Sequence, residues 1–412
     1  MFSSKFTFSL CVVLALFSRA HASTADQIRS KAPMTALVYD LREGNIASLE
    51  NAFLENEIDF FLDYEGVANS SLSSLYYLRA AAKKIRDRDY GAASNLLKSV
   101  RSHANQKAYL EAVILAMTGK LQPAMQAFQT LLKNTQNMSP RLRNLTLMGA
   151  ARVAHELGNY SQAIFYYSKV SQLDPLFFQA VYEKAWSFYM DGDMNGALGA
   201  TLAFMTPYSN SMFFPEGPII RAAAFYHLCM YERANEVIEN MKSSYLPLQA
   251  QIQELRRRAP QTWLFDERVL ETADKRILSF MIADPTFRSL QRAYLSLIDE
   301  TKTLSGAQLS VANEALAFVR RSLVAEANRV LNLANTEIQE ALKQADMIQI
   351  EILQLGVNVL VGAPIEMRDD LSIIDLGNVD FSELVQFWPF QGEFWFDELG
   401  SYYYGLKSQC GS

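Results

Sequence analysis

One short segment has the residue types and the spacing of a calcium-binding loop. Asp191, Asp193 and Asn195 stand at alternate positions, as in the opening of an EF-hand loop. In such loops side-chain oxygens at alternate positions bind Ca²⁺, and a glutamate at the twelfth position closes the shell with two oxygens. The twelfth position here is Leu202. We therefore expect no metal site in this segment, and four histidines are too few for a His-rich site elsewhere.

Three carboxylates near the C-terminus have the chemistry of a general acid and base. Glu393, Asp397 and Glu398 lie close together in sequence, but no nucleophile accompanies them. The chain also lacks a glycine-rich phosphate loop and the motifs H-E-x-x-H, C-x-x-C and G-x-S-x-G. We expect these carboxylates to act as caps or to pair with arginines. No catalytic residue and no cofactor are predicted.

The composition excludes several classes of protein. Half of the 412 residues are hydrophobic, which is too apolar for a disordered chain. Lysine and arginine number 38 against 44 aspartates and glutamates, so the net charge is −6 and no basic excess exists to bind nucleic acid. With 18 glycines and 12 prolines, the chain is poor in the turn residues of a β-sandwich or barrel. A large, mostly helical protein is expected.

Residues 1–22 have the pattern of a secretory signal peptide. Lys5 supplies a positive charge, and Phe6 to Phe17 form a short apolar run. We expect cleavage after Ala22, which leaves Ser23 as the new N-terminus. A retained membrane anchor is the alternative, but the run is shorter than the ~20 residues that span a bilayer. The protein is therefore predicted to be periplasmic or secreted, with no transmembrane segment after signal removal.

Two cysteines, Cys229 and Cys410, remain when the signal peptide takes Cys11 with it. In an oxidising compartment two thiols can pair. A disulfide that closes so long a loop would contribute ~4–5 kcal/mol in the chain-entropy account. Cys229 also lies among apolar residues such as Phe225 and Met230, so a buried free thiol is the alternative. The sequence leaves both readings open.

The middle of the chain repeats a helix–turn–helix pattern. A small residue opens each second helix at intervals of 31, 39, 34 and 37 residues, and another marks each first helix where neighbouring helices approach closely. The second-helix residues are Ala93, Ala124, Ala163, Ala197 and Ala234, and the first-helix residues are Ala81, Ala112, Ala151, Ala185 and Ala222. Turn residues stand five positions before four of the second-helix alanines, at Gly119, Gly158, Gly192 and Cys229. A bulkier residue follows each by four, at Leu97, Phe128, Tyr167, Thr201 and Ile238.

This pattern resembles the tetratricopeptide repeat (TPR), a helix–turn–helix unit of 34 residues. The best copy, residues 144–177, carries the Gly, Tyr, Ala, aromatic and Pro signature positions, although Leu147 replaces the aromatic of the first helix. We predict an all-α fold in which residues 23–247 form a TPR-like α-solenoid. Each hairpin then buries its apolar face on the next, which gives a superhelix with a concave surface. A generic antiparallel α-solenoid is the alternative.

Helix geometry projects a set of side chains onto the concave surface, since residues at i, i+3, i+4 and i+7 share one face. Those opposite the packing alanines are rich in Tyr and Trp, a composition typical of protein-binding surfaces. They are Tyr109, Arg152, His155, Tyr182, Trp186, Tyr189, Tyr226 and His227. We predict that they bind a protein or peptide partner. The alternative is that several of the aromatics belong to the repeat core.

Residues 248–356 lack the repeat signature but keep helical periodicity. Pro285 after Asp284 is typical of a helix start. A long helix is predicted from Ala307 to Leu355, with an apolar stripe whose mean step of about 3.5 residues suits a coiled-coil seam. The stripe consists of Leu316, Val319, Leu323, Ala327, Val330, Ala334, Ile338, Leu342, Ala345, Ile348, Ile352 and Leu355. We expect residues 265–304 to fold back on this helix as an intramolecular hairpin; a homodimer through the seam is the alternative.

Residues 357–412 are predicted to form an extended connector and an aromatic C-terminal tail. Nine aromatic side chains lie between Phe387 and Tyr404. A tail of this kind would aggregate if it were exposed, so it must dock on something. We expect it to dock on the helical hairpin or on the last repeat, with Cys410 near Cys229. A tail that binds a partner is the alternative.

The whole pattern resembles the exported repeat proteins of bacterial gliding-motility assemblies in the cell envelope. Beside the repeats, the segments that carry the resemblance are Trp388 to Phe390, Gly392 to Trp395, Asp397 to Gly400, and Cys410. The resemblance implies a periplasmic scaffold in an envelope-spanning complex. We therefore predict an exported, non-enzymatic scaffold that binds a protein or peptide partner. The alternative is an envelope enzyme, or the substrate-presenting subunit of one, that uses the tail carboxylates.

Overall fold

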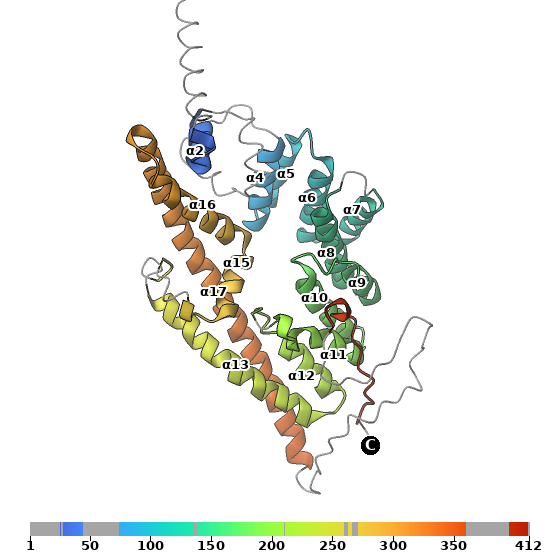
Figure 1. Ribbon diagram of the computed structural model, residues 1–412. Coiled ribbons are helices and arrows are strands. Elements are labelled where there is room, and N and C mark those ends of the chain that lie inside the picture. The colour runs from blue at the N-terminus through green and yellow to red at the C-terminus, as the bar shows by residue number, and fades with distance from the viewer. Residues whose placement is uncertain are drawn as a thin grey trace, which may run out of the picture. The chain divides into compact units, whose positions relative to one another are not determined.

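The computed structural model is helical wherever it has regular structure (Figure 1). The residues that it describes are 25, 28–43, 74–134, 138–209, 211–258, 263–265, 271–359 and 395–410. For these residues the all-α prediction is confirmed. The predicted cleavage residues Ala22 and Ser23 lie outside them, as do residues 360–394 of the predicted connector and tail. None of the helices in the described ranges combines the length and the apolar character needed to cross a membrane.

The chain separates into two compact units. Unit 1 consists of Met1–Leu110, Pro260–Asp266 and Met281–Val330, and unit 2 consists of Glu111–Ala259, Glu267–Phe280 and Leu331–Ser412. The helices that contribute to both units are α6 (Ala104–Met117), α15 (Lys275–Ala283) and α17 (Gly306–Val359). The predicted boundary at residue 247 falls inside helix α13 (Tyr231–Arg257), so the units do not follow it.

In unit 1 a buried glutamate anchors the first described helix. α2 (Pro33–Glu43) begins beside α16 (Pro285–Thr301), whose Glu300 is 3% exposed. The Glu300 carboxylate accepts hydrogen bonds from the backbone N–H groups of Met34 and Thr35, at 2.9 and 2.8 Å, and from the Thr35 hydroxyl at 2.6 Å. The first N–H groups of a helix lack intrahelical partners and attract negative charge. The charge of Glu300 is therefore stabilised by the helix that it holds.

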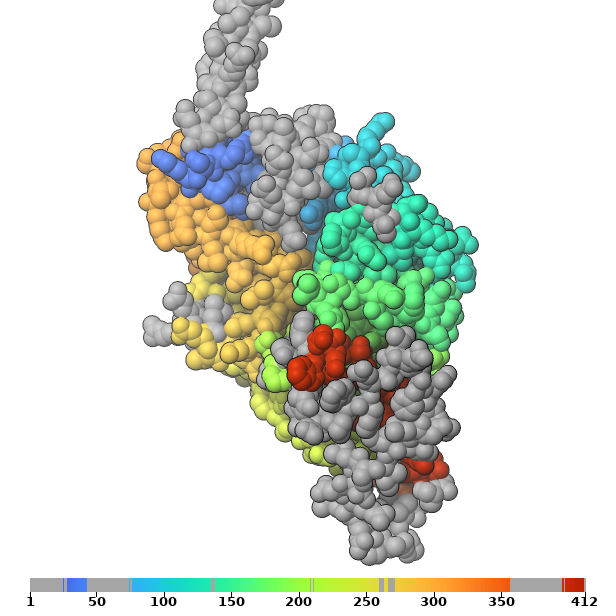
Figure 2. Space-filling view, turned by 45° about the vertical axis from the view of Figure 1, so that its right-hand side comes forward, coloured from blue at the N-terminus to red at the C-terminus, as the bar shows by residue number. Residues whose placement is uncertain are grey.

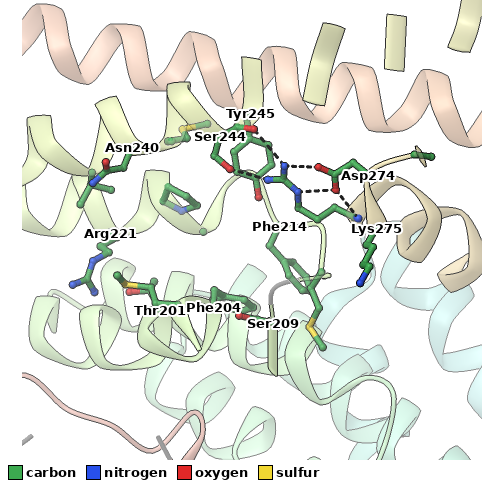
Figure 3. Close-up of a pocket in the computed structure, with 18 residues that line it drawn as sticks. Thr201, Phe204, Ser209, Phe214, Arg221, Asn240, Ser244, Tyr245, Asp274 and Lys275 are labelled. Carbon is green, nitrogen blue, oxygen red and sulfur yellow. Dashed lines mark hydrogen bonds and ion pairs between the residues drawn. The ribbon is translucent and has the colours of Figure 1, made fainter. Parts of the chain in front are cut away.

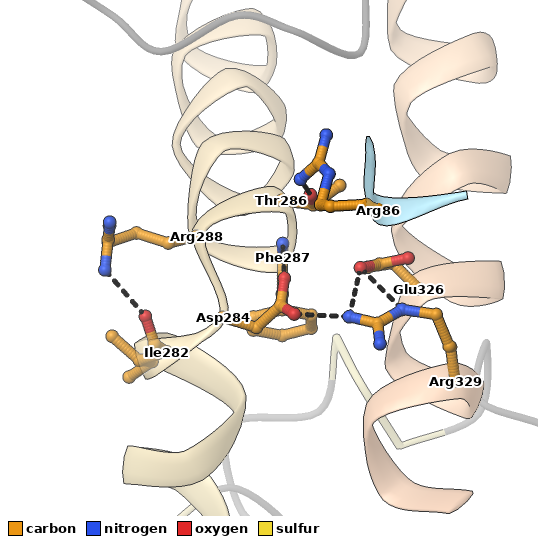
Figure 4. Close-up of polar contacts among 8 residues, drawn as sticks. All are labelled: Arg86, Ile282, Asp284, Thr286, Phe287, Arg288, Glu326 and Arg329. Carbon is orange, nitrogen blue, oxygen red and sulfur yellow. Dashed lines mark hydrogen bonds and ion pairs between the residues drawn. The ribbon is translucent and has the colours of Figure 1, made fainter. Parts of the chain in front are cut away.

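Asp284 starts α16, as predicted. Its side chain accepts a hydrogen bond from the Phe287 N–H at 2.9 Å, and Pro285 occupies the first turn. The same carboxylate forms an ion pair with Arg329 of α17, which also pairs with Glu326 (Figure 4). α16 therefore lies alongside the N-terminal part of α17, as the predicted hairpin requires.

The helices of the repeating region pack in the order of the sequence. In unit 1, α4 (Ser74–Arg86) pairs with α5 (Tyr90–Lys98). In unit 2 each helix from α7 to α13 packs against the next, and α10 also contacts α8 and α12. These helices are α7 (Leu121–Lys133), α8 (Pro140–Glu156), α9 (Tyr160–Tyr167), α10 (Phe177–Met190), α11 (Met194–Leu202), α12 (Gly217–His227) and α13. Two short 3₁₀ turns, η2 (Ala203–Met205) and η3 (Pro207–Ser209), follow α11. Helices α8, α10 and α12 thus form a row of neighbours.

One type of turn connects the two helices of every pair. A residue in the left-handed conformation, with φ between +58° and +83°, occurs at Arg88, Gly119, Gly158, Gly192 and Cys229. In each turn the next residue donates its backbone N–H to the carbonyl five positions earlier, at 2.9 Å. This is the Schellman C-cap, which satisfies carbonyls that a helix end leaves unpaired. The sequence predicts four of these residues and misses Arg88, because arginine rarely adopts this conformation.

The ten alanines of the repeating pattern are completely buried. Each of them is 0% exposed. The residues four positions after the second-helix alanines are buried as well, and even the weakest of them, Thr201, is 2% exposed and donates its hydroxyl to the Leu198 carbonyl at 2.8 Å. A methyl side chain allows two helices to approach closely, whereas a larger one would hold them apart. The repeated alanines therefore mark the positions at which neighbouring helices pack closely, as expected.

The C-terminal part of α17 pairs with α13 (Figure 1). Lys242 of α13 donates to Gln349 at 2.7 Å and forms an ion pair with Asp346 at 2.7 Å. Further along α13, Arg256 donates to Asn332 at 2.6 Å. Residue numbers rise on one helix as they fall on the other, so the two helices are antiparallel. The predicted partner, residues 265–304, therefore accounts for only part of the long helix.

Most of the apolar stripe predicted for the long helix is buried, and the rest is partly buried. Seven of its members are at most 1% exposed, namely Val319, Leu323, Ala327, Val330, Ala334, Ile338 and Ala345. α17 begins at Gly306 and continues to Val359, so it passes through Gly356, where the sequence predicted its end. The alternative of a homodimer through this seam stays a prediction.

Replacing Gly158 with alanine should lower the free energy of unfolding by about 1 kcal/mol, the cost of a left-handed non-glycine residue. Gly158 has φ +73°, and a Cβ there would meet no atom within 4 Å, so the cost comes from the backbone alone. Urea denaturation measures the change. Gly91→Ala in α5 is the control, since a Cβ there would meet only an Asp89 oxygen at 4.0 Å and φ is not positive. Equal losses in both variants would contradict this account of the turn.

Candidate functional site

Most of the predicted partner-binding residues lie together in unit 2. They come from three first helices: Arg152 and His155 from α8, Tyr182, Trp186 and Tyr189 from α10, and Tyr226 and His227 from α12. Because α10 contacts both α8 and α12, residues three or four apart on each helix form one row. We name the row of Tyr182, Trp186, Tyr189, Tyr226 and His227 the aromatic face.

Polar contacts join α8 to α10 at one end of the row. Arg152 donates from Nε and Nη2 to the Glu183 carboxylate, at 2.7 and 2.6 Å. The Arg152 side chain is 53% exposed, so this ion pair is at the surface. One turn later, Nδ1 of His155 lies 2.9 Å from the Ser187 hydroxyl. These two residues therefore connect neighbouring helices.

Rings connect α10 to α12 across the aromatic face. The Trp186 and Tyr189 ring centres are 5.7 Å apart, and those of Tyr189 and His227 are 5.3 Å apart. Tyr226 and His227 follow at 6.0 Å. At the other end, the Trp186 indole N–H donates to the Tyr182 hydroxyl at 3.1 Å. Edge-on ring pairs of this kind stabilise a surface beyond the area that they bury.

The aromatic face is partly covered by the chain itself. Tyr182, Trp186, Tyr189 and Tyr226 are half-buried and pack against the core of unit 2, which Ile352 of α17 also joins. Burial, together with the nearby Glu351 carboxylate of α17, raises the pKa of both Tyr189 and Tyr226. The rings are partly exposed, as the groove prediction requires, and partly packed on the core, as the alternative requires. The rings form a continuous surface, and α17 lies along it.

Three carboxylates beside the aromatic face raise its negative potential. Tyr182 donates its hydroxyl to Glu216, which precedes α12. Burial, and then the charges of Glu216 and Glu340, raise the pKa of Glu337 to about 7. Burial and the charge of Glu340 raise the pKa of Glu216 as well. Sequence analysis misses Glu337 and Glu340 because α17 was not expected beside α12. The only sequence feature that points to them is their spacing of three residues, which places them on one face of the helix.

The remaining predicted site residues lie elsewhere. Tyr109 belongs to the part of α6 in unit 1, where it is half-buried. Asp397 and Glu398 are exposed on the short 3₁₀ turn η6 (Phe396–Glu398), and Glu393 lies outside the described residues. Among the described residues, the acid–base hypothesis therefore concerns two exposed carboxylates.

The segment of residues 395–410, which we name the strap, lies on helices of unit 2 (Figure 2). Cys410 near its end forms a disulfide with Cys229, with the two Cα atoms 5.1 Å apart. Cys229 is the left-handed residue of the turn between α12 and α13. The sequence left open whether Cys229 is a buried free thiol or is paired with Cys410, and in the structure the two cysteines are paired. The strap docks near the last repeat, as expected for the tail.

Backbone contacts fit the strap closely to α10 and α11. Asn195 accepts from the Leu406 N–H at 2.9 Å and donates to the Leu406 carbonyl at 3.1 Å. A Cβ on Gly199 would lie 1.9 Å from the Tyr402 carbonyl oxygen, so only glycine permits this approach. Lys184, which is 6% exposed, donates to the Gly400 carbonyl at 2.5 Å, and burial lowers its pKa to about 8.

The segment that resembles a calcium loop is one of the repeated turns. Gly192 is its left-handed residue, and Asp193 accepts from the Gly196 N–H at 2.8 Å as the N-cap of α11. Its oxygens are therefore used to start a helix. In the described part of the chain, no group of three or more His, Cys, Asp or Glu residues is arranged to hold a metal ion.

Comparison with known proteins gives no family assignment. No protein-family model matches the chain, and no curated protein matches it. The resemblance to TPR proteins and to gliding-motility proteins therefore stays a prediction from the residues that carry it. The site is characterised by its own geometry, which is a row of rings and hydrogen-bonded polar groups beside three carboxylates.

Replacing Gly199 with alanine should lift the strap from α11, because the added Cβ meets backbone that cannot rotate away. The Cys229–Cys410 disulfide should then be reduced by dithiothreitol about tenfold faster, as followed by thiol alkylation and mass spectrometry. Gly158→Ala is the control, since it weakens a turn that the strap does not touch. An unchanged reduction rate in Gly199→Ala would show that the close fit does not hold the strap.

Glu337→Gln should remove a pH-dependent loss of stability. The folded state raises the pKa of Glu337 from 4.5 to about 7, so it binds this proton more tightly than the unfolded state. Stability therefore falls as the pH rises from about 4.5 to 7, by roughly 1–2 kcal/mol after allowance for solvent screening. Urea denaturation at pH 5 and pH 7.5 measures the difference. The exposed Glu236→Gln should keep the native pH dependence; identical slopes in both variants would contradict the assignment.

Proposed function

We propose that the chain is an exported, non-enzymatic scaffold of the TPR-like α-solenoid type that binds a protein or peptide partner at the aromatic face. The observation that carries the proposal is the unbroken row of rings across α10 and α12. Aromatic side chains are enriched at protein interfaces because they supply large contact areas with little loss of conformational freedom. Four of these rings stay half-exposed although α17 lies along them.

The solenoid part of the proposal is supported by the equivalence of the helix pairs. Five turns share one backbone geometry, and ten alanines at repeating positions are completely buried. Stacked hairpins of this kind bury their apolar faces on their neighbours and present their first helices side by side. Such a row offers an extended surface, which suits a partner that lies across several helices.

The charges beside the aromatic face favour a partner with basic side chains. Glu337 and Glu340 have no ion-pair partner among the residues that the structure describes, and Glu351 contacts Tyr226. A lysine or arginine placed here would gain from these carboxylates and from the faces of the rings. It would also relieve the repulsion that raises the pKa of Glu337. We therefore propose a basic protein segment as the ligand.

The non-enzymatic part of the proposal is supported by how the polar groups are used. Arg152 and His155 are held in contacts between helices, and Asp397 and Glu398 are exposed. An acid–base pair needs an enclosed site in which the environment separates the two pKa values. An envelope enzyme, or a subunit that presents its substrate, remains the alternative function.

The proposed compartment is the bacterial cell envelope, and the proposed context is a motility or other envelope-spanning complex. The signal-like pattern of residues 1–22 supports export, and the Cys229–Cys410 disulfide suits an oxidising compartment.

Charge reversal at Glu340 tests the proposal. Crosslinking pull-downs from envelope fractions should recover a specific protein with the native chain, and Glu340→Lys should reduce its recovery at least tenfold. Glu340 is exposed, so the substitution leaves the core intact. Glu236→Lys, an exposed glutamate on α13, is the matched control and should capture the partner normally. Equal capture by all three chains would place the binding surface elsewhere, and the absence of any partner would favour the enzyme.

A further inference from the structure

A cavity of about 710 Å³ lies within unit 2. It adjoins the Tyr182 end of the aromatic face, because the Tyr182 ring centre lies 6.3 Å from that of Phe204 and 5.7 Å from that of Phe214, and both phenylalanines line the cavity. Its walls come from the end of α11 with the 3₁₀ turns, the start of α12, the middle of α13 and the residues that lead into α15 (Figure 3). This volume is in the range of small-molecule sites in proteins, roughly 300–1,000 Å³. The cavity is therefore large enough for a ligand of its own.

Most of the cavity wall is apolar and adaptable. Phe204 and Phe214 form one side, with ring centres 4.8 Å apart, and Met205, Met212 and Met241 add flexible thioethers. Methionine side chains adjust to the shape of what they contact. Met205 is 56% exposed, although methionine normally gains from burial. A lining of this kind suits a flexible apolar chain.

The charges of the cavity are opposite in sign to that of the whole chain. Arg221, Lys275 and Arg276 line it together with a single carboxylate, Asp274, so the lining carries a net charge of 3 − 1 = +2 in a chain of net charge −6. Asp274 is bound to Arg276 by bonds of 3.1 and 2.8 Å, and these hydrogen bonds hold its pKa below the usual value. Arg221 and Lys275 remain as cations without a carboxylate partner among the described residues.

Arg221 has an unused hydrogen-bond donor. Its guanidinium lies over the rings of Phe225 and Tyr404, at 5.1 and 5.3 Å, and Nη2 donates to the Tyr404 hydroxyl at 2.9 Å. Nη1 is buried and has no hydrogen-bond partner. A buried charged donor without a partner is destabilising, and an anion bound beside it would relieve that cost. Figure 3 shows Arg221 and Lys275 on opposite sides, with Phe204 and Phe214 between them.

We propose that this cavity binds an amphipathic anion, with its carboxylate or phosphate head at Arg221 and its apolar chain along Phe204 and Phe214. The head compensates the charge of the Arg221 guanidinium, and the chain displaces water from rings and thioethers. Lys275, which is exposed at the opposite side, raises the local positive potential and so attracts the anion. This ligand differs in class from the protein partner proposed for the aromatic face, and its site adjoins that face at Tyr182.

Calorimetric titration of the full mature chain with three probes of equal chain length tests the proposal. Dodecanoate and dodecyl phosphate should each bind saturably below their micelle concentrations, and the tighter of the two identifies the head group. Dodecanol, which has no charge, should bind at least tenfold more weakly. Equal binding of dodecanol, or no saturable binding of either anion, would overturn the proposal.

Two variants separate recognition of the anion from support of the fold. Arg221→Gln should weaken binding of the preferred anion about tenfold, because it removes the charge and the free donor. Tyr404→Phe removes the bond between Arg221 and the strap but keeps the guanidinium, so its affinity should stay within about twofold of native. Native affinity in Arg221→Gln, or an equal loss in both variants, would show that Arg221 does not hold the ligand.

Discussion

Close approach of helix backbones is the constraint on which the rest of the structure depends. Two helices can come together only where the side chain between them is small, and here that side chain is an alanine with no exposed surface at ten repeating positions. The close packing places α8, α10 and α12 side by side. Only then do Tyr189 and His227, which are 38 residues apart in sequence, bring their rings to 5.3 Å. The binding surface that we propose is thus a consequence of alanines on the opposite side of the helices.

One of the turns between the helices anchors the strap as well as reversing the chain. Glycine occupies three of the five left-handed positions, as its freedom at positive φ would suggest. The turn after α12 has Cys229 instead, which joins the strap through Cys410. In the chain-entropy account a disulfide across 181 residues stabilises the fold by ~4–5 kcal/mol. That contribution exceeds the ~1–2 kcal/mol cost of a left-handed cysteine.

The sequence is a good guide where structure is local and a poor one where it is not. The alanine spacing, the glycine turns and the Asp284 cap depend on neighbours within a few dozen residues, and each of them is found. The pairing of α13 with α17 joins Lys242 to Gln349, more than one hundred residues apart, through polar contacts that have no periodic signal. The carboxylates Glu337 and Glu340 were missed for the same reason. The cavity at Arg221 is likewise assembled from four separate segments, none of which carries a motif.

Different segments of the chain cover different parts of the surface of unit 2. The strap covers part of α10 and α11, and α17 lies along part of the aromatic face. What stays accessible is a row of rings beside the carboxylates of Glu216, Glu337 and Glu340. We propose that this surface is a recognition site, since aromatic side chains are enriched at protein interfaces. The apolar cavity with its two cations adjoins the Tyr182 end of this surface and suits a ligand of the opposite charge.

In-cell photo-crosslinking tests the central claim most directly. A benzophenone side chain is placed at His227, which is exposed on the aromatic face, and in a parallel chain at Phe165 of α9, which is 55% exposed and outside that face. Our account predicts a specific protein adduct from position 227 and none from position 165. Adducts from position 165 alone, or from neither position while the strap residue Tyr403 crosslinks, would contradict a partner at the aromatic face.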